Sequence, residues 1–247
     1  MSYHLHITNK NYSSWSLRPW ILMKQLSLLF EEHLHPLAPG SGFRQPQWKE
    51  FSPVCHVPCL HYHAADHSSE PIILWESLAI AEFLQEQFPD KNIYPKDLAA
   101  RAWARSAVAE MHAGFGSMRQ EMGMNVSLRV ELSDEAFNED LVKDLKRINE
   151  LWEEGLNKFG GPFLAGKEFG AVDAFFAPVV LRFGSYLGAR ERYLGEGPNR
   201  YLEVVSGLEG VKEWVAAGVA EKERHEAHEI ENREGPGRVV VGDLRDE

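Results

Sequence analysis

Two adjacent serines, Ser13 and Ser14, stand where a polar turn meets the first helical pattern of the chain. Apolar residues recur at near-helical spacing from Trp15 onward, so we expect a helix to begin near Ser14. The first turn of a helix carries unpaired N–H groups and the positive end of the helix dipole, which together lower the pKa of a thiol held there. A serine hydroxyl at this place can donate a hydrogen bond to the sulfur. The alternative is that both serines only cap the helix.

The chain has two cysteines, and neither lies in the stretch from Ser13 to Ser16. Thiol–disulfide exchange of the thioredoxin or glutaredoxin kind needs a low-pKa cysteine at such a helix start, so it is not expected. Two cysteines in a chain of this length also exclude a disulfide scaffold and fit a reducing compartment.

A second group of side chains could in principle bind zinc. Six candidate ligands fall within thirteen positions, namely Cys55, His56, Cys59, His61, His63 and His67. Their spacing is not that of a Cys-x2-Cys pair, and Pro58 interrupts them. Alternation along a strand would point His61 and His63 the same way, toward solvent. We therefore expect structural roles for these residues and no metal site.

Composition limits the possible partners. The chain has 247 residues, of which 44% are hydrophobic and 26% charged, with a formal net charge of -11. This field repels phosphate backbones, so no nucleic-acid partner is expected. No apolar run approaches the roughly 18 residues of a membrane span, and no signal peptide is visible. The sequence predicts a soluble cytoplasmic protein with no membrane partner.

The elements that would position the serines form a small α/β unit over residues 1–88. Short strands and helices alternate in it, and residues 89–97 form a proline-bounded linker. The expected elements are a strand over Tyr3–Asn9, a helix from Ser14, a strand within Glu31–Leu37, a loop over 38–56 with a helical turn near Trp48, strands near Leu60 and over Ile72–Trp75, and a helix from Glu76 to Phe88.

The pattern is helical from Leu98 onward. Helices are expected over 99–122, 135–159, 173–187, 199–206 and 208–218, and the third is apolar enough to be buried. Charged residues dominate 221–247, apart from a possible short strand at Val239–Val241. We expect this tail to be solvated or mobile. The predicted domains are therefore 1–88, the linker 89–97, an all-helical domain over 98–220, and the tail 221–247.

Four segments, in this order, resemble motifs of the cytosolic glutathione transferase family. Each is weak alone, but together they cover roughly residues 3–220. They are Ser13-Ser14-Trp15-Ser16-Leu17-Arg18, similar to the Ser-Ser-Cys-x-x-Arg signature of the serine-type zeta class (the maleylacetoacetate isomerase-like members); Val57-Pro58, like the cis-proline before the third strand; Glu76-Ser77-Leu78-Ala79-Ile80, at a helix start; and Phe163-Leu164-Ala165-Gly166 followed by Val172-Asp173-Ala174. Trp15 stands where the zeta motif has cysteine.

The resemblance implies an α+β fold, with a thioredoxin-like domain followed by an all-α helical-bundle domain. It also implies glutathione as cosubstrate, no metal, and a homodimer. Ser13 is implied as the thiolate partner, with Ser14 as its competitor if the helix begins one residue later. Val57 and Pro58 would hold the cysteinyl backbone, while Glu76 and Ser77 would hold the γ-glutamyl group. Glu76 and Ser77 could instead reflect the ordinary charge preference of a helix start.

Further contacts to glutathione are less sharply indicated. The family places Arg18 near the site, although a salt bridge or a packing role would explain it equally well. The glycyl carboxylate needs a donor from the loop 38–50. Candidates are Arg44, Gln45 and Lys49, of which Gln45 is the one we select.

The second substrate is expected against the long helix of the helical half. Its residues Met111, His112, Phe115 and Arg119 would line an adaptable apolar pocket, with Met118 and Met122 nearby, and Arg119 would meet an anionic substrate. Core packing or a dimer contact would explain the same residues.

The sequence therefore predicts a glutathione transferase that conjugates, isomerises or reduces a small electrophile, all from one thiolate. The alternative is a non-catalytic binding or interaction protein of the same fold, for which the charged tail would be the extra surface.

Overall fold

The structure is a computed structural model that describes residues 1–38, 40–41, 45–65 and 70–246. Arg44 and His67, two of the residues considered above, lie outside these ranges. Among the described helices, none has the length and apolar character needed to cross a membrane.

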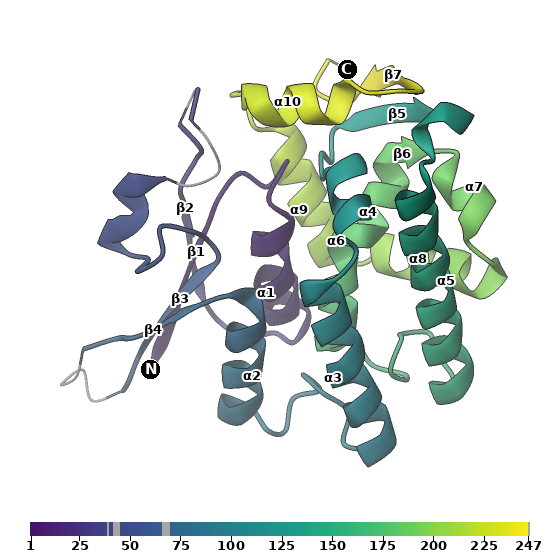
Figure 1. The fold of residues 1–247 in the computed structure, drawn as a ribbon. Coiled ribbons are helices and arrows are strands. Elements are labelled where there is room, and N and C mark those ends of the chain that lie inside the picture. Colours follow the sequence, from purple (N-terminus) through teal and green to yellow (C-terminus); the bar gives the residue numbers. More distant parts are fainter. Residues whose placement is uncertain (39, 42–44, 66–69, 247) are drawn as a thin grey trace.

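The N-terminal part is a four-stranded sheet with two helices on one face (Figure 1). Its strand order is β2-β1-β3-β4, in which β1 is parallel to β2 and antiparallel to β3. Successive side chains of a strand point to opposite faces of the sheet. On the face that the helices cover, Leu5, Ile7 and Leu60 are fully buried. The elements are β1 (Ser2–Ile7), α1 (Ser14–Gln25), β2 (Glu31–Leu34), β3 (Cys59–His63), β4 (Ile72–Trp75) and α2 (Ser77–Gln87).

The opposite face of this sheet carries histidines. They alternate with the core residues along β1, β2 and β3. The histidines of this face are His4, His6, His33, His61 and His63, together with His35 just after the end of β2. A short 3-10 helix (Pro46–Glu50) and Phe51 cover part of this face, with the Phe51 ring stacked 4.5 Å from His6 and 4.1 Å from His35. Burial, followed by the neighbouring imidazoles, lowers the pKa of His6 to about 3.

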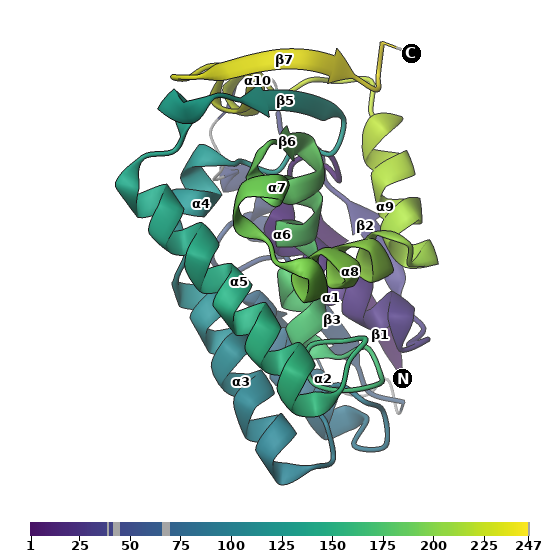
Figure 2. The ribbon, with the colours of Figure 1, turned by 90° about the vertical axis from the view of Figure 1, so that its right-hand side faces the viewer.

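The C-terminal part is built around α6 (Ala171–Ser185), whose residues are nearly all buried. This helix packs against α1 and α3 and crosses the middle of the molecule (Figures 1 and 2). The other helices are α3 (Leu98–Ala113), α4 (Gly116–Glu121), α5 (Glu139–Phe159), α7 (Ala189–Tyr193), α8 (Glu196–Ser206), α9 (Glu209–Val219) and α10 (Glu226–Arg233), with a 3-10 turn at Asp134–Ala136. The predicted fold class, a thioredoxin-like domain followed by a helical domain, is confirmed.

The fourth sequence motif is explained by one buried carboxylate. Asp173 accepts hydrogen bonds from the backbone N–H of Leu164, at 3.0 Å, and of Gly170, also at 3.0 Å. One side chain therefore caps α6 and fixes the loop that contains Phe163–Gly166.

The long helix expected over 99–122 is broken in two. α3 ends at Ala113, and Phe115 adopts a left-handed conformation with φ of 56° before α4 begins at Gly116. Gly114 permits the break because a Cβ there would lie 2.8 Å from the carbonyl oxygen of Glu110. The helical spacing of apolar residues continues through Gly114 and Phe115, so nothing in the sequence indicates the turn.

The expectation of a solvated tail is wrong. Residues 221–246 form α10 and the strand β7 (Arg238–Asp243), which pairs with β5 (Leu128–Leu132). With β6 (Tyr186–Leu187) these strands make a second sheet, of order β6-β5-β7, within the otherwise helical part (Figure 2). The charges that suggested solvation pair with one another instead, since Arg245 binds both Glu229 and Asp243.

Candidate active site

The N-terminus of α1 presents two serine hydroxyls. The helix begins at Ser14, as expected, and Ser13 is its N-cap. The Ser13 hydroxyl accepts a hydrogen bond from Ser16 N at 3.3 Å and donates one to Ser16 Oγ at 2.8 Å. Ser14 is buried, and its hydroxyl makes no hydrogen bond with the described part of the chain. Both serines are therefore at a helix start with a hydroxyl that can be directed to a ligand.

Two adjacent cavities meet beside these serines. The first has a volume of about 490 Å³, and the serines Ser13 and Ser14 line it. The second, of about 630 Å³, extends past Pro58 to Glu76. Trp15, His56 and Val57 line both, so the two cavities join at the start of α1. A ligand in the second cavity can therefore bring a reacting atom to the serines, opposite a partner in the first.

The second cavity contains the two remaining motif segments. The Val57–Pro58 peptide bond is cis, as the resemblance implied. Glu76 has φ of 82°, a conformation that costs a non-glycine residue about 1–3 kcal/mol and that is typical of functional sites. Next to it, the Ser77 hydroxyl is buried and has no hydrogen-bond partner among the residues that the structure describes. Ser77 begins α2, so an unpaired donor and a helix N-terminus lie beside the Glu76 carboxylate.

Three arginines converge beneath the first cavity. Arg18 is 1% exposed, and its guanidinium lies 4.1 Å from the ring centroid of Trp15. Within the described part of the chain, its Nε and Nη1 have no hydrogen-bond partner. Burial, and then the charges of Arg119 and Arg182, lower the pKa of Arg18 to about 9. Arg182 is also buried and donates to the carbonyl oxygens of Arg119, at 3.0 Å, and Met122. Arg119 and Arg182 line the cavity.

Several predicted site residues do not line either cavity. Met111 and Phe115 are buried in the core, Met111 within α3 and Phe115 at the break that follows this helix. His112 faces Glu76, with 3.4 Å between its Nε2 and a carboxylate oxygen. Gln45 is buried and hydrogen-bonded to Ser41 and Gln47, rather than lining either cavity. Of the proposed second-substrate residues, only Arg119 lines the first cavity.

Several lining residues were not predicted. Tyr12, Trp48 and Arg182 line the first cavity, as do His228 and Glu231 of the C-terminal segment. Arg182 could have been found, since it is the one charged residue between Asp173 and the end of a very apolar helix. Nothing in the sequence placed His228 or Glu231, because their segment looked solvated.

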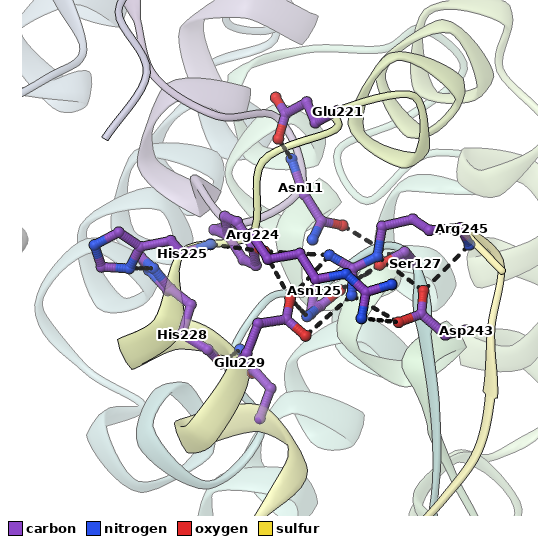
Figure 3. A network of polar contacts seen from close by, with 12 residues as sticks. Asn11, Asn125, Ser127, Glu221, Arg224, His225, His228, Glu229, Asp243 and Arg245 are labelled. Atoms are coloured by element: carbon purple, nitrogen blue, oxygen red, sulfur yellow. Dashed lines mark hydrogen bonds and ion pairs between the residues drawn. The ribbon is translucent and has the colours of Figure 1, made fainter. Parts of the chain in front are cut away.

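The C-terminal segment holds the loop that leads to Ser13 (Figure 3). The Glu221 carboxylate accepts hydrogen bonds from the backbone N–H of Lys10, at 2.6 Å, and of Asn11, at 3.3 Å. Tyr12 donates to Glu229 at 2.6 Å and accepts from Arg245 at 3.2 Å. With its hydroxyl so engaged, Tyr12 does not compete with the serines as a donor to a ligand in the cavity.

Two family models match the chain. The glutathione S-transferase N-terminal domain matches residues 12–87, and the glutathione S-transferase C-terminal domain matches residues 131–217. Together they span about two thirds of the chain, including the serines, Glu76 and the buried helix α6.

Curated relatives and solved structures agree with this assignment. Glutathione S-transferase 1 of Dianthus caryophyllus is 26% identical over 168 residues, which cover 68% of this chain and 71% of the relative. Glutathione S-transferase L1 of Arabidopsis thaliana is 24% identical over 201 residues, covering 80% and 70%. The fold is similar to that of a glutathione transferase homologue from Burkholderia with bound glutathione, with a TM-score of 0.62 and 19% identity over 88% of this chain and 98% of that one.

Proposed function

The chain belongs to the glutathione S-transferase family, and we propose that it is a serine-type glutathione transferase in which the Ser13 hydroxyl holds the thiol of bound glutathione as a thiolate. The observation that carries this proposal is the junction of the two cavities at the start of α1. The tripeptide would lie in the cavity between Val57 and Glu76. Its sulfur would reach the junction, and the electrophile would enter from the other cavity.

The γ-glutamyl end of glutathione would meet the Glu76 carboxylate and a hydroxyl that has no hydrogen-bond partner among the described residues. Glu76 would pair with the γ-glutamyl ammonium, and the unpartnered Ser77 hydroxyl at the start of α2 would donate to the adjacent carboxylate. Buried polar groups without partners are uncommon, which favours a ligand as the missing acceptor. Val57 would offer its backbone to the cysteinyl residue.

The cap geometry allows Ser13 to act without loss of the helix. A hydroxyl has one donor and two acceptor positions, so Ser13 can keep accepting from Ser16 N while its O–H turns from Ser16 Oγ to the sulfur. This hydrogen bond and the dipole of α1 would lower the thiol pKa from about 8.5 toward neutrality. Ser14, which lines the same cavity and whose hydroxyl makes no hydrogen bond with the described residues, remains the alternative donor.

The arginines favour an electrophile that carries a carboxylate or another anionic group. Arg119 and Arg182 line the first cavity, and Arg18 lies beneath it without a paired anion among the described residues. An anionic substrate would supply the missing negative charge. Conjugation, isomerisation and peroxide reduction all begin from the same thiolate. The family resemblance further supports a homodimer in the cytoplasm.

The test is glutathione binding by calorimetry at several pH values, in buffers with different ionisation enthalpies. We expect the wild type to release a proton near neutral pH, because thiolate formation must release one. Ser13→Gly is the sharpest variant, since glycine at an N-cap costs only a few tenths of a kcal/mol compared with serine. It should bind glutathione without releasing the proton.

Matched variants separate the outcomes. Ser14→Ala should behave as the wild type, and if it alone loses proton release, Ser14 is the activating residue. Glu76→Gln should weaken binding without changing the proton count per bound glutathione. Absence of glutathione binding by the wild type would overturn the enzyme proposal and leave the non-catalytic binding protein.

A further inference from the structure

Three side chains at one edge of the histidine face form a group that the proposed glutathione site does not use. His4 lies on β1 opposite Glu31 of the edge strand β2, and His33 follows on β2. His4 Nδ1 is 3.1 Å from His33 Nε2 and 3.5 Å from Glu31 Oε2, while His33 Nε2 is 3.3 Å from Glu31 Oε1. Within the described ranges, this is the one trio of potential metal ligands whose donor atoms all lie within 4.8 Å of one another.

Hydrogen bonds alone cannot satisfy all three contacts. If both ring nitrogens carry a proton, each can donate to Glu31, but two N–H groups then face each other across 3.1 Å. If only one nitrogen is protonated, the lone pair of the other faces a carboxylate oxygen. If neither nitrogen is protonated, lone pairs face each other in all three contacts. A cation at the centre would make all three contacts favourable at once.

The three contact lengths fit a small tetrahedral ion. Zinc bonds to histidine nitrogen and carboxylate oxygen at about 2.0–2.2 Å, so two ligand atoms in a tetrahedral site lie about 3.4 Å apart. The two ring nitrogens are 3.1 Å apart, and each faces a different oxygen of the Glu31 carboxylate, at 3.5 Å from His4 and 3.3 Å from His33, all close to this value. Two imidazoles and one carboxylate are also a donor set that suits zinc.

The surroundings orient the first ligand and leave space for a fourth. Ser2 Oγ lies 3.0 Å from His4 Nε2, so the hydroxyl can accept the Nε2 proton and leave the Nδ1 lone pair directed at the centre. The side chains of His4 and His33 are 26% and 32% exposed, and that of Glu31 is 63% exposed. Water therefore has access to a fourth position.

We propose that His4, Glu31 and His33 bind one zinc ion, which links β1 to the edge strand β2. The cysteines considered from the sequence take no part in it. Cys55 and Cys59 are buried and directed at the carbonyl oxygens of Pro46 and Phe51, and burial raises the pKa of Cys59 to about 12. The proposed zinc ligands instead lie on two strands that are neighbours in the sheet but distant in the sequence.

The test is zinc titration of untagged, chelator-stripped protein by calorimetry. We expect one zinc ion per chain in the wild type. His33→Gln and Glu31→Gln should each weaken binding more than about 100-fold, beyond the roughly 10–100-fold effect of losing only a supporting partner. His61→Gln is the matched control, because His61 lies on the same face but its Nε2 is 2.7 Å from the carbonyl oxygen of Phe51. It should keep the wild-type affinity.

Thermal unfolding shows whether a variant fails to bind zinc because it has lost a ligand or because it is misfolded. The three ligands are partly exposed, so the zinc-free variants should melt at the wild-type temperature. Zinc should then raise the midpoint of the wild type and of His61→Gln only. The proposal is overturned if the wild type shows no saturable zinc site, or if His33→Gln and Glu31→Gln retain it. Glutathione binding by His33→Gln should be unchanged, since its site lies elsewhere.

Discussion

Replacing Glu229 with glutamine tests how strongly the C-terminal segment is attached to the loop before Ser13. Burial alone would raise the pKa of Glu229, but hydrogen bonds from Arg245, Tyr12 and Arg233 outweigh it and lower the pKa from 4.5 to about 2. A difference of this size corresponds to about 3 kcal/mol of folding stability at neutral pH. Glutamine keeps the size of the side chain but leaves Arg245 with less negative charge.

The sign of the pH dependence follows from the lowered pKa. The stabilisation is complete above the unfolded-state value, and it is lost as pH falls through the range from about 5 to 2, where the unfolded chain binds the proton first. Urea unfolding should therefore show Glu229→Gln less stable than the wild type by about 3 kcal/mol at pH 7, but by only about 1 kcal/mol at pH 3.

The exposed Glu226 on the same helix supplies the control. Glu226→Gln should change stability by less than about 0.5 kcal/mol at either pH. The reasoning is refuted if Glu229→Gln loses no more stability than Glu226→Gln, or if its deficit is equal at pH 7 and pH 3. The first result would mean that the network contributes nothing net, and the second that the loss is not electrostatic.

Three further substitutions probe the site and its support. Arg119→Met should raise the KM for an anionic electrophile about tenfold or more and leave that for a neutral one unchanged, as measured by steady-state kinetics; equal effects on both would contradict a charge contact. Ser77→Ala should leave the thermal midpoint of the free protein unchanged, because the hydroxyl has no partner in the described ranges, yet weaken glutathione binding about tenfold in calorimetry. Gly218→Ala should destabilise the folded protein by about 1–3 kcal/mol in urea unfolding, because a Cβ there would lie 2.9 Å from Asn11 N. Gly184→Ala is the control: a Cβ at Gly184 meets open space, so this variant should be neutral or stabilising.

Local patterns predicted two of the central helices, α1 and α6, for physical reasons. The start of α1 at Ser14 followed from the change of period beside a polar turn, and the buried helix α6 followed from its apolar composition. The break at Gly114–Phe115 was not predicted. The left-handed conformation of Phe115 depends on tertiary contacts, and the spacing of apolar residues carries no information about those contacts. Phe115, at this break, is buried in the core and does not line the first cavity.

The C-terminal segment shows a different limit of sequence reasoning. Composition cannot tell a charge that faces water from one that faces an opposite charge, and in this segment Glu229, Arg233, Asp243 and Arg245 are of the second kind. The zinc ligands were missed for a related reason. His4 and His33 are far apart in sequence, and only the parallel pairing of β1 with β2 brings them together.

The folded C-terminal segment also changes how enzyme and interaction protein can be told apart. A free tail could be removed without harm to an enzyme, so loss of a partner on truncation would have indicated an interaction module. Glu221 and Glu229, however, bind the loop over Lys10–Tyr12, which ends at the N-cap serine. Truncation at residue 221 would remove both carboxylates and displace Ser13 whatever the protein does. Proton release on glutathione binding separates the two functions because it reports on the serine itself, in the intact chain.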